Sequence, residues 1–293
     1  MVPRSRAHVR DVVELVRLPA VLSVPGDVLS GAAAAGRPLH GRTFGLVASS
    51  ACLYWAGMAL NDWADRDLDA HERPERPIPS GRVTPGFALA LAAGLTGVGV
   101  GAAALAGGRR AVALAVPLAA TVWAYDLRIK SSRAGPVAMA LARGMDVMLG
   151  AGGSPAGVPP ALVVAAHTAA VTGLSRTEVE GGRPDVARAA VAATAVITAA
   201  VPSACGVGRR GTGTARLLGV GLLAGYAVPL ARAQLAAVRE PGPTPVRRAV
   251  GAGILGLIPL EAALVSTRAT RAAAALASLW PLAKGLSRKV SPT

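Results

Sequence analysis

Long stretches of this sequence contain no Asp, Glu, Lys or Arg, and this feature constrains the fold more than any other. Such runs extend over 83–108, 147–175 and 189–208. Each reaches the roughly 20 residues that a helix needs to cross a bilayer. Because 52% of the residues are hydrophobic and only 16% are charged, the chain is too apolar for a soluble domain of its length. The sequence therefore predicts a polytopic membrane protein.

The expected architecture is all-α, with about nine transmembrane helices, because a helix satisfies its own backbone hydrogen bonds in lipid. Apolar runs and chain-breaking residues place the spans at 16–36, 43–61, 86–107, 110–125, 134–152, 158–177, 186–207, 215–233 and 247–266. The segment GAGGSPAGVPP favours a turn between two spans, with one broken helix as the alternative. The tail after Arg268 is either returned by a further membrane segment near 272–286 or left on the outer side.

Basic residues indicate which side of the membrane each loop occupies. With a cytoplasmic N-terminus, the inside loops hold more than twice as many Lys and Arg residues as the outside loops, and this bias sets topology. We therefore expect a multi-pass protein of the cell membrane with its acidic loops on the cytoplasmic face. The formal net charge of +15 does not indicate a nucleic-acid partner, because no aromatic-interleaved basic segment or nucleic-acid module accompanies it.

The polar segment NDWADRDLDAHERPERPIPSGR follows the second expected span. Asn61, Asp65 and Asp69 are four residues apart, so a helix would project all three from one face. With Asp62 they form an NDxxDxxxD pattern, and Mg²⁺ is held by one or two carboxylates together with a substrate's phosphates. Arg66 lies inside the pattern, where its charge would contact the anion that the metal bridges. A solvated, charge-balanced loop is the alternative.

A second loop on the same face reads WAYDLRIKSSR. It contains Tyr125, Asp126, Arg128, Lys130 and Arg133. Its basic side chains would take a departing diphosphate. An orientation signal with interfacial aromatic residues is the alternative.

A third loop on this face, SRTEVEGGRPD, contains the acidic residues Glu178, Glu180 and Asp185. The second and sixth expected spans therefore each end in carboxylates. This repetition indicates two halves that face one another across a shared cavity, each with ligands for a separate cation.

Four ionisable residues fall inside expected spans: Asp27, Arg143, Asp146 and Glu261. Charges within a membrane segment face an interior cavity far more often than lipid, so we expect them to line one. Arg143 and Asp146 are three residues apart and can pair on one helix face.

These motifs, in this order on nine spans, resemble the UbiA superfamily of intramembrane prenyltransferases. The likeness is carried by Asn61, Asp65 and Asp69 with RPIPSG at 76–81, followed by the segment 125–130. Because it covers nearly the whole chain, we expect one domain over residues 1–293. It implies a helical bundle around a central lipid-open cavity, with Mg²⁺ ions holding an isoprenyl diphosphate under a cytoplasmic cap.

The resemblance also implies roles for individual residues. The catalytic set would be Asp65, Asp69 and Lys130. Metal ligands would be Asn61, Asp62, Asp65 and Asp69, with Glu178 and Glu180 for a second ion. The diphosphate would contact Tyr125, Arg66, Arg128 and Lys130, which lowers the cost of charge on the leaving group. The allylic cation would then be attacked by a small aromatic or other electron-rich, polar acceptor.

The second acidic motif departs from the family pattern. Where DxxxD is usual, this chain has Glu178 and Glu180 followed by Gly181 and Gly182, which is similar to the EboC-like branch. Two other functions stay open: a UbiA-like terpene cyclase, and a non-catalytic membrane transporter or binding protein. A transporter would place its carboxylates near the bilayer midplane at broken helices, whereas these lie at one face beside arginines.

Overall fold

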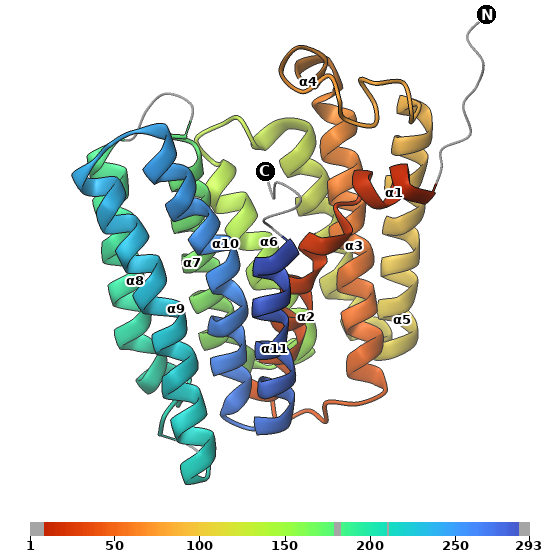
Figure 1. Ribbon diagram of the computed structural model, residues 1–293. Helices are drawn as coiled ribbons and strands as arrows, with labels where there is room; N and C mark the ends of the chain where they lie inside the picture. The colour runs from red at the N-terminus through yellow and green to blue at the C-terminus, as the bar shows by residue number, and fades with distance from the viewer. Residues whose placement is uncertain (1–8, 179–182, 210, 287–293) are drawn as a thin grey trace, which may run out of the picture.

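The computed structural model describes residues 9–178, 183–209 and 211–286, and this part of the chain is helical throughout apart from turns and loops (Figure 1). The α-helices are α1 (Val9–Leu15), α2 (Val24–Ala34), α3 (Arg42–Ala64), α4 (Arg66–Glu72), α5 (Pro85–Ala124), α6 (Gly135–Ala151), α7 (Val158–Ser175), α8 (Pro184–Ala204), α9 (Gly213–Arg239), α10 (Pro243–Ser266) and α11 (Thr270–Leu286). Shorter segments are the 3₁₀ helices η1 (Leu18–Ser23) and η3 (Pro155–Gly157) and the π-helical turn η2 (Tyr125–Ile129). Among the described residues, six helices are long and apolar enough to cross a membrane, which confirms the all-α, multi-pass prediction.

Helix α5 contains two of the expected spans. Gly108 has φ 63° and ψ −155°, a conformation that glycine adopts without steric cost. The indole Nε1 of Trp123 donates a 3.1 Å hydrogen bond to Oγ1 of Thr96, although a straight helix would hold these residues about 40 Å apart. The chain therefore turns back at Gly108, and the predicted spans 86–107 and 110–125 run beside one another.

The first expected span, 16–36, is shorter than predicted. The chain forms the 3₁₀ helix η1 and then α2, which has 11 residues. A proline occupies one of the first two positions of each segment. Because proline has no backbone N–H to continue a preceding helical ladder, the two segments do not merge into one long helix.

Two alternatives left open by the sequence are now decided. The segment GAGGSPAGVPP is a turn between two helices: α6 ends at Ala151, and Gly152 has φ 64°. At the C-terminal end, α11 packs against α10 and runs back toward the end of the bundle that carries α4 (Figure 1). The tail is therefore returned by a further helix as far as Leu286.

Helix α2 lies at the centre of the bundle, in contact with α3, α6, α7 and α10. Two glycines let its backbone approach α6 closely. A Cβ atom on Gly31 would lie 1.9 Å from the carbonyl oxygen of Val147, and one on Gly150 would lie 2.0 Å from that of Val28. Small residues at such crossings are the usual basis of helix association in membranes. This contact fixes the position of α2 beside the cavity described next.

Candidate active site

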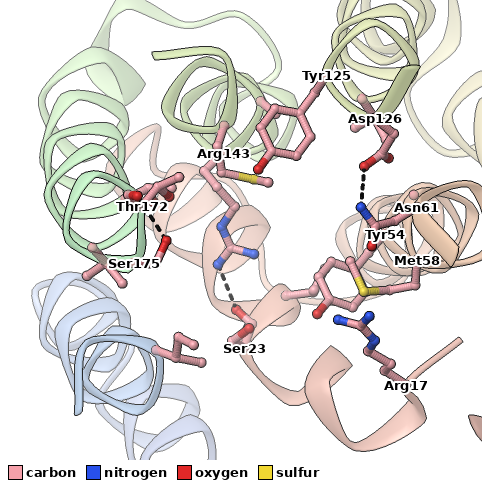
Figure 2. Close-up of a pocket in the computed structure, with 18 of the residues that line it drawn as sticks. Arg17, Ser23, Tyr54, Met58, Asn61, Tyr125, Asp126, Arg143, Thr172 and Ser175 are labelled. Carbon is pink, nitrogen blue, oxygen red and sulfur yellow. Dashed lines mark hydrogen bonds between the residues drawn. The ribbon is translucent and has the colours of Figure 1, made fainter. Parts of the chain in front are cut away.

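A cavity of about 1080 Å³ lies among α3, α6, α7 and α10 and is closed on one side by α1 and η1. Figure 2 shows side chains from these elements pointing into it. Its outer end, where α3 finishes, carries Asn61, Asp65, Asp69, Asp126 and Glu178. Deeper walls are largely apolar. The expectation that the first and third acidic loops face one cavity is thus confirmed for the described residues.

The first acidic motif is positioned by a bend between two helices. Helix α3 ends at Ala64, and α4 begins at Arg66. Asn61, Asp65 and Asp69 all line the cavity, as their spacing predicts. The amide Nδ2 of Asn61 donates a 3.1 Å hydrogen bond to Oδ1 of Asp126 (Figure 2). This bond joins the end of α3 to the π-helical turn η2.

Each aspartate of this motif that was expected to bind metal also contacts a basic side chain. Lys130 Nζ lies 2.6 Å from Asp65 Oδ1. Arg76 Nη1 lies 2.6 Å from Asp69 Oδ2 and 3.4 Å from Asp62 Oδ1. Asp62 is buried and is not among the cavity-lining residues.

The N-terminal segment closes over this end of the cavity. Arg17 donates a 3.1 Å hydrogen bond from Nη2 to Oδ1 of Asp62. Arg82 contacts Asp11 and Glu14 of α1 at 2.7 Å and 2.8 Å, and its hydrogen bonds to Glu14 and Asp11 raise the pKa of its guanidinium group. These ion pairs hold α1 against the loop that follows α4.

Two arginines that were expected to bind diphosphate, Arg66 and Arg128, do not line the cavity, and neither does Lys130, which instead pairs with Asp65. Arg66 lies over the ring of Trp63, with its Cζ atom 4.8 Å from the ring centroid, and it pairs with Asp67. Arg128 is exposed. The local chain geometry accounts for both: Arg66 begins α4 directly after Asp65, and Arg128 lies two residues beyond Asp126 in the turn η2, so neither side chain follows the direction of its acidic neighbour. Tyr125, by contrast, lines the cavity.

The third loop contributes one described carboxylate. Oε1 of Glu178 is buried and has no hydrogen-bond partner among the described residues. Burial raises the pKa of this carboxyl, while Arg247 and Arg73 act in the opposite direction. Asp185 instead forms an exposed pair with Arg183. Glu180 lies outside the described residues.

The donor chemistry at the outer end fits Mg²⁺ that is shared with a substrate. Among the described residues, no three acidic, histidine or cysteine side chains converge to hold a metal by themselves. Mg²⁺, however, is usually held by one or two carboxylates, with phosphate and water completing its shell. Asp65 and Asp69 present carboxylate oxygens to the cavity, and the buried Oε1 of Glu178 lacks a donor. The site therefore suits a metal that arrives with phosphate oxygens.

Sequence reasoning missed several contributors to this site. Asp126 was noted in its motif but not assigned a role, although it is buried and bonded to Asn61. Arg76, by contrast, was expected among the arginines that follow the acidic pattern and indicate a diphosphate site, and it pairs with Asp69. Arg17 was given no role in the site, and nothing in its local sequence indicates the contact with Asp62.

Comparison with known proteins identifies the group to which this arrangement belongs. A model of the UbiA prenyltransferase family matches residues 24–239. The chain belongs to the UbiA prenyltransferase family. The resemblance recognised from the motifs is thereby confirmed, while the assignment to the EboC-like branch stays a prediction.

Curated UbiA relatives match over limited segments. Digeranylgeranylglyceryl phosphate synthase of Methanopyrus kandleri is 40% identical over 87 residues, which are 30% of this chain and 31% of the relative. The 4-hydroxybenzoate octaprenyltransferase of Cupriavidus necator is 44% identical over 63 residues, 21% of this chain and 22% of the relative. These alignments thus span about a third or less of each relative's length.

Solved structures show the same fold over most of the chain. A UbiA homologue from Aeropyrum pernix has a TM-score of 0.65 and 20% sequence identity, covering 84% of this chain and 96% of that chain. A UbiA homologue from Archaeoglobus fulgidus, whose structure contains GPP and Mg²⁺, has a TM-score of 0.65 and 15% identity, covering 92% and 99%. At these identities the likeness concerns the fold.

Proposed function

We propose that this UbiA-family chain is an Mg²⁺-dependent intramembrane prenyltransferase. It transfers an isoprenyl group from an isoprenyl diphosphate to an aromatic or other electron-rich acceptor. One observation carries the proposal: carboxylates and basic side chains gather at the outer end of a cavity whose deeper walls are largely apolar. A diphosphate with a hydrocarbon tail has the matching distribution of charge. The unit spans residues 1–293, multi-pass in the cell membrane, with these loops on the cytoplasmic face.

The residues at the outer end have distinct roles in this proposal. Asn61, Asp65 and Asp69 would hold Mg²⁺, which when bound supplies charge neutralisation to the leaving diphosphate. Glu178 would provide a ligand from the opposite side. The buried Oε1 atom of Glu178, which accepts no hydrogen bond from the described residues, supports this role.

Basic side chains beside these carboxylates would bind the diphosphate. Lys130 and Arg76 lie within 2.6 Å of motif carboxylates, so their charges are already directed toward the place where phosphate oxygens would lie. Fixed positive charge there stabilises the transition state of ionisation more than the ground state. Tyr125 lines the cavity, and its hydroxyl would donate a hydrogen bond to a phosphate oxygen.

Names of relatives give independent support. Two curated relatives are a digeranylgeranylglyceryl phosphate synthase and a 4-hydroxybenzoate octaprenyltransferase, and a protein of the same fold was solved with GPP and Mg²⁺. These proteins take different acceptors. The common element is the isoprenyl donor, and this is the element that we carry over.

The test uses purified protein in nanodiscs with radiolabelled geranyl, farnesyl and geranylgeranyl diphosphates and a panel of phenols and alcohols. We expect Mg²⁺-dependent diphosphate release that EDTA abolishes and added Mg²⁺ restores. Asp65→Asn should reduce it at least about 100-fold, since removal of one electrostatic contributor typically costs that much. Asp185→Asn is the matched control, because Asp185 is exposed and paired with Arg183.

Three results would contradict the proposal or redirect it. Equal release by wild type and Asp65→Asn would remove the motif from catalysis. Release with a cyclic hydrocarbon product and no use of acceptor would indicate a terpene cyclase. Transport of a prenyl diphosphate across the vesicle membrane without its cleavage would indicate a transporter.

A further inference from the structure

A second group of charged residues lies deeper in the same cavity, and the proposed function so far leaves it without a role. We call it the inner cluster: Asp27, Ser50, Arg143, Asp146 and Glu261. Its members come from α2, α3, α6 and α10. Arg143, Asp146 and Ser50 line the cavity, and Asp27 and Glu261 lie behind Arg143.

Arg143 connects three of these helices. Its Nε atom lies 2.9 Å from Asp27 Oδ2, and its Nη2 atom lies 3.2 Å from Glu261 Oε1. Nη2 also donates a 3.3 Å hydrogen bond to the carbonyl oxygen of Ser23 (Figure 2). The two carboxylate side chains are 0% exposed. The charge of Arg143 is therefore matched by buried acids on two neighbouring helices.

Asp146 is the third carboxyl group of the inner cluster, which has Arg143 as its single basic residue. The hydroxyl of Ser50 donates a hydrogen bond to Oδ2 of Asp146, while Oδ1 has no hydrogen-bond donor among the described residues. With either Asp27 or Glu261 ionised beside it, Arg143 offers no surplus positive charge. An anion that reached this depth would therefore find the guanidinium of Arg143 already paired with carboxyl groups.

Ser50 and its hydrogen-bond partner Asp146 lie too far from the outer end to contact the diphosphate. Ser50 precedes Asn61 by eleven residues on α3, which corresponds to about 16 Å along the helix. The inner cluster must therefore face either the hydrocarbon tail or the acceptor.

Hydrocarbon is a poor match for this wall. A prenyl tail against Asp146 and Arg143 would exclude water from polar groups without replacing its hydrogen bonds, which is costly. Apolar walls are available elsewhere in the cavity, at Leu53 and Leu118 on one side and Leu257 on another. The tail is better placed there, which leaves the inner cluster for the polar end of an acceptor.

We propose that the inner cluster selects acceptors that carry an uncharged hydroxyl group at the end remote from the reacting centre, and that it rejects acceptors with a carboxylate or phosphate there. Asp146 accepts the hydrogen bond from that hydroxyl, with Ser50 orienting the carboxylate. Asp27 and Glu261 act through Arg143 and are positioning residues. This assignment rests on the proposed prenyl transfer and specifies its acceptor class.

The experiment measures binding, so that it does not depend on turnover. Protein in nanodiscs is saturated with Mg²⁺ and geranyl S-thiolodiphosphate, an unreactive donor analogue, and then titrated calorimetrically with 4-hydroxybenzyl alcohol or 4-hydroxybenzoate. The two phenols differ only in an alcohol or a carboxylate at the remote end. We expect wild type to bind the alcohol at least about tenfold more tightly, the scale of one hydrogen bond to a charged group.

Asp146→Asn should narrow this ratio to within about threefold, because the amide presents an N–H donor to the carboxylate of 4-hydroxybenzoate. Its affinity for the donor analogue should equal that of wild type, which checks that the variant folds. Asp185→Asn should keep the wild-type ratio.

Stronger binding of 4-hydroxybenzoate by wild type would overturn the proposal without any variant and would point to Arg10 or Arg17 as the anion partner. An unchanged ratio in Asp146→Asn would overturn it as well. So would binding of the donor analogue with neither phenol. Failure of the donor analogue itself to bind would instead refute the proposed prenyl transfer, and the acceptor assignment would fall with it.

Discussion

The close approach of α2 and α6 leads to a quantitative prediction for Gly150→Ala. An alanine Cβ at this position would lie 2.0 Å from the carbonyl oxygen of Val28. The obstructing atom belongs to a helix backbone, so it cannot rotate away, and the two helices must separate. Overpacking of this kind costs about 1–3 kcal/mol, and we take the upper value because the contact is rigid.

A matched control lies on the same helix. A Cβ on Gly144 would have its nearest neighbours at 3.4 Å and 3.5 Å, which is ordinary contact. Replacing a mid-helix glycine by alanine stabilises the helix by about 0.5–1 kcal/mol. Gly144→Ala should therefore raise the free energy of unfolding by that amount. Gly150→Ala should lower it by about 2 kcal/mol, which is the overpacking cost less the same helix stabilisation.

Thermal unfolding of the two purified variants, followed by tryptophan fluorescence at one scan rate in one detergent, measures the difference. About 2.5–3 kcal/mol corresponds to midpoints about 5–12 °C apart, with Gly144→Ala the higher. Separation of α2 from α6 would also lengthen the 2.9 Å contact between Asp27 and Arg143. If Gly150→Ala unfolds at or above the midpoint of Gly144→Ala, the argument from backbone proximity is refuted.

Two further predictions concern the outer end of the cavity. Asp126→Asn should weaken the affinity for Mg²⁺ together with geranyl S-thiolodiphosphate, measured by calorimetry, about tenfold. Arg128→Gln, at an exposed position, should change this affinity less than about twofold. Equal effects of the two variants would remove Asp126 from the site. Arg82→Ala breaks the ion pairs to Asp11 and Glu14 and should speed amide exchange of α1 about threefold to tenfold, since an ion pair whose arginine is partly exposed contributes little. Unchanged exchange would show that other contacts hold α1.

Much of the helical framework is predictable because the membrane imposes it. Backbone groups in lipid must bond within their own helix, so the positions of the spans follow from composition. The predicted spans 86–107 and 110–125, which form the two halves of α5, are an example. The shorter first span is an exception, since η1 and α2 share an apolar run whose interruption depends on proline placement.

The site was predictable where one short stretch of sequence supplies it, and not where segments distant in sequence meet. Asn61, Asp65 and Asp69 line the cavity as their spacing indicates. The bond from Asn61 to Asp126 and the contact of Arg17 with Asp62 depend on how helices are rotated against one another. No local pattern encodes that rotation. Arg66 lies outside the cavity lining for a local reason, because it begins α4 directly after Asp65 and its side chain packs over Trp63.

For the proposed function, the ion pairs at the outer end have a consequence for how the metal and the diphosphate would bind. Arg17, Arg76 and Lys130 balance Asp62, Asp65 and Asp69 one for one. A lone divalent cation must displace a cation from its carboxylate, and a lone diphosphate must displace a carboxylate from its cation. When both bind, the metal takes the carboxylates that the basic side chains leave, and the diphosphate takes those basic side chains. Their affinities should therefore be linked, with each ligand raising the apparent affinity for the other by the same factor.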